Sequence, residues 1–187
     1  MRAQFRSVLS LVLSLAPLGA GAPDFNPLLS VARTTWPEKQ HIGVVCNYRE
    51  SADQIDALAA AAAPGTLITV VDARSASHVA SAEAILVRRQ ADFLVLLPRD
   101  PIFHEGGFVA SQLVRGLARK GMPSVGTTLA ALEQGAVFSI GAGTGNQLRV
   151  TERLRGTVSV VLPSRTASLQ VPVEYARGVK VEVAALP

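Results

Sequence analysis

The sequence predicts an α/β protein, with a mostly parallel, five-stranded sheet, helices on both of its faces and a C-terminal β tail. From residue 41 onwards, short apolar runs alternate with longer Ala-rich stretches that have helical spacing. Hydrophobic residues make up 49% of the chain and aromatic residues only 5%, which suits buried parallel strands covered by small-residue helices. The charged fraction of 17% leaves enough apolar material for a core and excludes a disordered chain.

Residues 1–22 have the pattern of a secretory signal peptide. Two arginines precede an apolar run from Ser7 to Pro17, and small residues then lead to an A-x-A sequence that ends at Ala22. Cleavage after Ala22 would leave Pro23 at the new terminus, so cleavage after Ala20 is the alternative. An uncleaved anchor is a further alternative, but the run is shorter than the roughly 20 apolar residues that span a bilayer. The pattern predicts export to the periplasm.

Each predicted strand is a short apolar run that ends in polar, Gly or Pro residues. The strands are expected at 42–46, 67–71, 92–97, 123–126 and 137–140. Helices are expected at 52–63, 78–89, 108–120, 129–134 and 146–155. The first of them illustrates the signals, because Ser51 is a good N-cap, Asp53 lies in the first turn and Pro64-Gly65 ends the helix.

Four segments follow from these elements. Residues 1–22 form the signal peptide, 23–40 a Pro-containing leader, 41–156 the α/β lobe and 157–187 a strand-rich tail. In the tail, 158–162 and 178–183 have the composition of edge strands, which predicts either a hairpin or a strand that returns to the sheet. Right-handed crossovers would wind the lobe into a flavodoxin-like arrangement with strand order 2-1-3-4-5.

Polar residues follow the predicted strands, and ligands of open α/β sheets bind beyond the carboxyl ends of the strands. The candidate ligand-binding residues are Asn47, Tyr48, Arg99, Asp100, Thr127, Thr128 and Gly141. Structural roles are the alternative for several of them: Asn47 could shape a turn and Thr128 could cap a helix. Asp72, which follows the second strand, could likewise cap a loop.

Several functions lack a sequence signal. Without the two signal-segment arginines the net charge of +4 falls to +2, and no basic run indicates nucleic-acid binding.

The sequence GAGTGN at 141–146 follows the fifth strand and differs from G-x-G-x-x-G, so no dinucleotide or other cofactor is expected. The three histidines lack metal-ligand spacing, and His104-Glu105 is expected to form at most a surface pair. With no nucleophile elbow and with Cys46 in an apolar run, we interpret the chain as a non-enzyme.

The order of segments from His41 to about Arg155 resembles the second lobe of ABC-transporter substrate-binding proteins of the TrpX-like family. The stretches that carry the resemblance are IGVVCNYRES, ADFLVLLPRDPIF, KGMPSVGTT, LEQGAVFSIGAG and VPVEYARGVKVEV. It implies a periplasmic-binding-protein-like lobe of an ABC-type uptake or sensing system, with a small solute bound in a cleft lined by the candidate residues given above.

Family members clamp the solute between two lobes, whereas residues 23–40 are too few to build a second one. The half-site is therefore expected to be completed by a homodimer or by an inner-membrane permease or sensor. The alternative function is that of a periplasmic regulatory or adaptor protein, similar to YfiR-like proteins, that binds a membrane protein without a solute. Trp36-Pro37 near the start of the chain favours this alternative.

Overall fold

The computed structural model describes residues 23–142, 148–152 and 179–186. The predicted signal peptide and the predicted strand at 158–162 lie outside these residues. In chain order the elements are α1 (Asn26–Thr35), β1 (His41–Cys46), α2 (Tyr48–Ala61), β2 (Leu67–Asp72), a 3₁₀ turn (Ala76–His78), α3 (Val79–Arg88), β3 (Phe93–Val95), α4 (Phe108–Arg119), β4 (Ser124–Gly126), α5 (Leu129–Gln134), β5 (Phe138–Ala142), β6 (Leu148–Glu152) and β7 (Lys180–Ala185).

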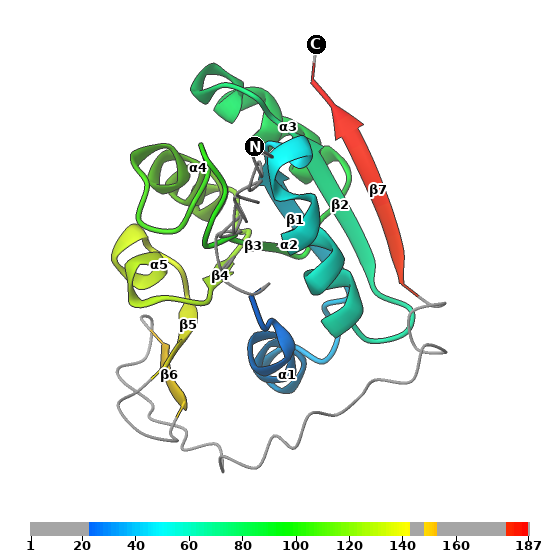
Figure 1. Cartoon of the computed structure of the whole chain (residues 1–187), viewed down its shortest axis with the longest axis vertical. Coiled ribbons are helices and arrows are strands. Elements are labelled where there is room, and N and C mark those ends of the chain that lie inside the picture. Colours follow the sequence, from blue (N-terminus) through cyan, green and yellow to red (C-terminus); the bar gives the residue numbers. More distant parts are fainter. Residues whose placement is uncertain (1–22, 143–147, 153–178, 187) are drawn as a thin grey trace, which may run out of the picture.

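The strands form one sheet in the order β6-β5-β4-β3-β1-β2-β7 (Figure 1). The predicted order 2-1-3-4-5 is confirmed as its central part, and all pairs within that part are parallel. Two further strands extend the five-stranded sheet that the sequence predicts. β7 joins β2 in parallel, so the C-terminal strand returns to the sheet rather than forming a separate hairpin. The fold is therefore a flavodoxin-like α/β lobe.

The helix predicted at 146–155 is wrong, because residues 148–152 form β6, which pairs antiparallel with β5. The first four residues of this segment, LRVT, alternate between apolar and polar, which is the period of a strand rather than of a helix. In the leader, residues 28–32 have the composition of a helical turn, and the structure forms the longer helix α1 there.

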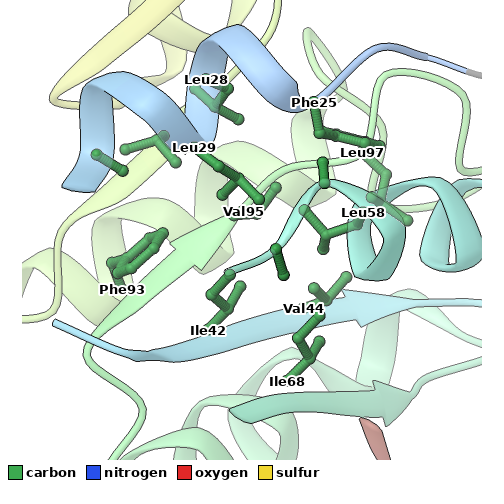
Figure 2. Close-up of a cluster of buried hydrophobic side chains, with 14 of the residues drawn as sticks. Phe25, Leu28, Leu29, Ile42, Val44, Leu58, Ile68, Phe93, Val95 and Leu97 are labelled. Carbon is green, nitrogen blue, oxygen red and sulfur yellow. The ribbon is translucent and has the colours of Figure 1, made fainter. Parts of the chain in front are cut away.

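Helices cover both faces of the sheet, as the sequence predicts. On one face, Leu28 and Leu29 of α1 and Leu58 of α2 pack on inward residues of the strands (Figure 2). On the other face, α3, α4 and α5 bury a second cluster that includes Leu86 and Leu113. Burial of these apolar side chains on both faces is the main source of stability and holds the strand ends in place.

Trp36 belongs to the first of these cores. Its ring lies 5.7 Å from that of Phe93 and 5.2 Å from that of Phe138, measured between centroids. Tilted ring pairs at such distances add stability beyond the buried area. The packing of Trp36 against the strands therefore explains this residue without a partner protein.

Candidate functional site

The carboxyl ends of β1 to β5 lie along one edge of the sheet, because these strands are parallel. We call this the carboxyl edge. It carries the loops that follow the strands. These loops contain five of the seven predicted site residues, and a sixth, Tyr48, is the first residue of α2. Gly141 is the exception, because it lies within β5, opposite Arg149 of β6, rather than in a loop beyond the strand.

Asp100, in the loop after β3, connects two loops of the carboxyl edge. One carboxylate oxygen, Oδ2, accepts hydrogen bonds from the N–H of Asn47 at 2.8 Å and from the hydroxyl of Ser51 at 2.7 Å. The other, Oδ1, accepts from the N–H groups of Ile102 at 2.9 Å and Phe103 at 2.6 Å. The side chain is buried, with both oxygens fully partnered. It sits at the N-terminus of α2, where the helix dipole favours an anion. The carboxylate of Asp100 therefore occupies the place at this helix N-terminus where an anionic ligand could otherwise bind.

Asp72, at the end of β2, is also partnered within the chain. It accepts hydrogen bonds from the N–H of Tyr48 at 3.0 Å and from Nε and Nη2 of Arg74 at 3.0 and 2.7 Å. Although burial acts in the opposite direction, the hydrogen bonds from Arg74 and Tyr48 hold the pKa of Asp72 below its ordinary value. Asp72 is therefore ionised, and its hydrogen bonds join the loop after β2 to the start of α2.

Arg99 is directed toward α2. Its N–H donates to Oε1 of Gln54 at 3.1 Å, and its guanidinium binds Asp53 at 3.0 Å. Both partners lie on α2, so Arg99 joins the β3 loop to that helix. Asn47 also contributes through its backbone, and no hydrogen bond from its side chain caps α2.

Glu105 forms a second buried carboxylate site, five residues after Asp100. Its Oε1 accepts from the N–H of Thr127 at 2.6 Å and from the hydroxyl of the same residue at 3.0 Å. Its Oε2 and the hydroxyl of Thr128 are buried, and neither makes a hydrogen bond of regular geometry with the described residues, although Thr128 lies near enough to Glu105 to affect its pKa. We call Glu105, Thr127 and Thr128 the Glu105 cluster.

Burial raises the pKa of Glu105, and the hydrogen-bonding groups of Thr127 and Thr128 offset only part of this effect. Gly126 permits the close approach, because a Cβ there would collide with Ala131 and lie 3.0 Å from Oε1 of Glu105. The expected surface pair of His104 with Glu105 is wrong, since Glu105 is only 7% exposed. Gly126, the last residue of β4, is the one signal in the sequence that is consistent with this packing.

Two large apolar side chains flank the Glu105 cluster. Phe108 is 76% exposed and Leu129 is 62% exposed. They are the first residues of α4 and α5, so both lie where these helices begin at the carboxyl edge. The loop before α4 approaches α5 closely, since a Cβ on Gly106 would lie 3.2 Å from Cβ of Ala130. Exposed apolar groups beside polar ones are typical of a surface that contacts another molecule.

A small hollow lies at the opposite, amino edge of the sheet. Leu29, Lys39, Thr66 and Phe93 are among the residues that line it. Its position does not coincide with any of the predicted site residues. Oε2 of Glu105 and Oγ1 of Thr128 lie instead at the carboxyl edge.

The described residues contain no cluster of His, Cys, Asp and Glu side chains that could hold a metal ion. Cys46 is buried, and this burial, with the nearby charges of Asp100 and Asp72, raises the pKa of its thiol far above the ordinary value. Among the described helices, none has the length and apolar character needed to cross a membrane.

The fold and the edge residues define a flavodoxin-like α/β lobe with a polar carboxyl edge. No protein-family model matches this chain, and no curated protein does so either.

Proposed function

We propose that this protein is an exported, solute-binding-like component of an ABC-type uptake or sensing system, which binds a small solute at the carboxyl edge without transforming it. The observation that supports this function best is the Glu105 cluster. It places two buried polar atoms that make no hydrogen bond of regular geometry, Oε2 of Glu105 and Oγ1 of Thr128, at the edge where ligands of such sheets bind. A buried polar atom without a partner costs free energy that a ligand can recover.

The Glu105 cluster favours a solute that donates hydrogen bonds. Both unpartnered atoms are oxygens, and a carboxylate prefers a donor such as an ammonium group, an amide N–H or a hydroxyl. Binding there breaks no hydrogen bond of the chain. At Asp100, by contrast, a ligand would have to replace the four hydrogen bonds that the carboxylate accepts.

The carboxyl edge of a single lobe provides only half of an enclosed site. Tight capture requires that most of the solute surface be covered. Phe108 and Leu129 extend into solvent beside the Glu105 cluster and offer an apolar surface for whatever completes the enclosure. We propose that a membrane permease or sensor, or a second copy of this chain, closes over this edge.

A second candidate function is that of a periplasmic adaptor that binds a membrane protein without a solute. The exposure of Phe108 and Leu129 favours it directly. Trp36 gives it no support, because its ring packs on Phe93 and Phe138.

A thermal-shift screen with single amino acids and small anions tests the first function. We expect at least one solute with a donor group to raise Tm in proportion to the logarithm of its concentration. Thr128→Val should weaken that shift. Thr34→Val, which removes an exposed hydroxyl that bonds Ser30 on α1, should leave it unchanged.

If no solute raises Tm, the solute-binding function is wrong. The adaptor function is then tested by placing a photo-crosslinking residue at Phe108 in intact cells. A crosslink to one membrane protein, lost when Leu129 is changed to Ser, would support the adaptor. Without a solute effect and without a crosslink, neither function stands.

A further inference from the structure

The outermost strand β7 presents a backbone edge without a partner. It is the last strand of the sheet and pairs with β2 on one side, and within the described ranges nothing pairs with its other side (Figure 1). The N–H of Lys180 donates to the carbonyl of Thr66, at 3.1 Å, and so points toward β2. Since successive residues of a strand alternate in direction, the N–H and C=O groups of Val181 and Val183 point outward.

The side chains of β7 separate into a charged face and an apolar face. Lys180 and Glu182 lie on the side of α3, where Glu182 binds Nζ of Lys180 at 2.6 Å and Arg89 at 3.1 Å. Val181 and Val183 lie on the opposite side and remain 38% and 46% exposed. Val179 precedes them on that side and packs against the core beneath α1 and α2. The strand therefore exposes a short apolar row and two opposite charges beside free hydrogen-bonding groups, which is an edge suited to strand addition.

We propose that β7 pairs antiparallel with β7 of a second copy, with Val181 at the two-fold axis. In this register Val181 lies opposite the partner's Val181, and Val179 lies opposite the partner's Val183. Lys180 lies opposite the partner's Glu182, and by symmetry Glu182 lies opposite the partner's Lys180. All the outward N–H and C=O groups in this stretch then find partners, and the valines of both copies form one continuous apolar row.

The charges select this register over its neighbours. Because a shift must preserve both the two-fold axis and the outward hydrogen-bonding groups, the axis can move only one residue along the strand at a time. Moving it to Lys180 places two lysines opposite each other, and moving it to Glu182 does the same with two glutamates. Like charges directly opposite are destabilising, whereas opposite charges stabilise an antiparallel pair. A second copy is therefore the partner that the sequence of β7 fits.

The two carboxyl edges face in opposite directions in this dimer, because the paired strands are antiparallel. Each copy keeps its own Glu105 cluster open to a solute or a membrane partner. This dimer is thus distinct from one that would close the half-site, and its existence does not depend on the proposed function.

Charge variants at the two-fold axis test the proposal. Because the paired edge is short, the mass of the purified protein is measured over a concentration series by analytical ultracentrifugation. We expect the unsubstituted protein to approach twice the monomer mass as concentration rises. Val181→Lys and Val181→Glu should each lose the dimer, because the new side chain meets its own copy. An equimolar mixture of the two should recover it as a heterodimer.

Thr34→Lys provides the matched control, because it adds the same charge to an exposed residue of α1, outside both β7 and the carboxyl edge. It should dimerise like the unsubstituted protein. Far-UV circular dichroism and a urea titration check that every variant is folded. Val181→Pro gives a second break that adds no charge, since proline is tolerated in an edge strand where its missing N–H would face outward.

Three results would overturn the proposal. One is a monomer mass at every concentration of the unsubstituted protein. Another is a dimer that Val181→Lys leaves intact, which would place the contact elsewhere. The last is a mixture of folded Lys and Glu variants that remains monomeric, because that result excludes Val181 from the two-fold axis.

Discussion

Asp100 and Glu105 are two buried carboxylates on one loop, and they differ in how completely the chain satisfies them. Asp100 accepts four hydrogen bonds, two at each oxygen. Glu105 accepts two bonds at Oε1 and none from the described residues at Oε2. The first carboxylate completes the scaffold of the carboxyl edge. The second has an oxygen, Oε2, that can still accept a hydrogen bond from a solute. This difference is why we propose the solute site on the β4–α5 side of the edge.

The largest expected effect comes from Asp100→Asn. An amide has donors on one side, and these would face backbone N–H groups or the Ser51 hydroxyl, so buried donors lose their partners. We expect a loss of about 3 kcal/mol in the free energy of unfolding, measured by urea titration. Asp53→Asn is the matched control and should cost at most about 1 kcal/mol, because Asp53 is exposed in its pair with Arg99. Equal losses in the two variants would show that the hydrogen bonds of Asp100 contribute no more to stability than the surface ion pair of Asp53.

Gly126→Ala should have the next largest effect. The added methyl group would collide with Ala131 and crowd Oε1 of Glu105, which forces α5 and the β3 loop apart. Overpacking of this kind costs about 1–3 kcal/mol, and the same urea titration measures it. An unchanged midpoint would show that these segments do not approach each other as closely as the structure has them.

Glu105→Gln should instead stabilise the protein at neutral pH, by about 1–2 kcal/mol. Its oxygen can still accept from Thr127, and its amide can donate to the hydroxyl of Thr128. The sign of the pH effect follows from the raised pKa of Glu105. Between the pKa of the unfolded chain and the higher folded value, the folded state binds more protons, so stability falls as pH rises.

The gain from Glu105→Gln should therefore shrink as pH falls toward the ordinary pKa of glutamate, because the glutamate is then protonated in both states. Urea titrations at a series of pH values measure this trend. A gain that is constant with pH, or a loss at neutral pH, would contradict the description of Glu105 as a buried, half-partnered carboxylate.

The smallest effects come from the two threonines of the Glu105 cluster. Thr127→Val removes a hydroxyl that donates to Glu105 and should cost about 1–2 kcal/mol. Thr128→Val removes a buried hydroxyl that lies near Glu105 but makes no hydrogen bond of regular geometry, so it should cost less than Thr127→Val, about 0.5 kcal/mol. The free energies of unfolding of the two variants give the comparison directly. The reverse order would mean that Thr128, not Thr127, holds the carboxylate.

The sequence was sufficient to predict the central fold. Apolar runs such as 42–46 and 67–71, with Ala-rich helices between them, predict buried strands of a parallel sheet. The right-handedness of the crossover connections then limits the possible strand orders. It was not sufficient for β6 and β7. Five-residue segments such as LRVTE carry weak periodicity, and their pairing depends on which edge of the finished sheet is free.

The candidate site was only partly predictable. The rule for strand ends placed Asn47, Asp100 and Thr127 at one edge, and the structure brings them there. It could not tell which side chains would be hydrogen-bonded within the chain, because two of the four partners of Asp100 come from a segment about 50 residues away. Glu105 was missed for a related reason. A carboxylate in a Gly-rich loop resembles a surface residue until the fold buries it.

Chemical-shift mapping tests the central claim most directly. The backbone N–H signals of the isotope-labelled protein are recorded while the solute that raises Tm most is added. The account predicts that the largest shifts occur at Thr127, Thr128 and Phe108, at the carboxyl edge. Shifts concentrated at Leu29, Lys39 and Thr66, around the hollow at the amino edge, would contradict it.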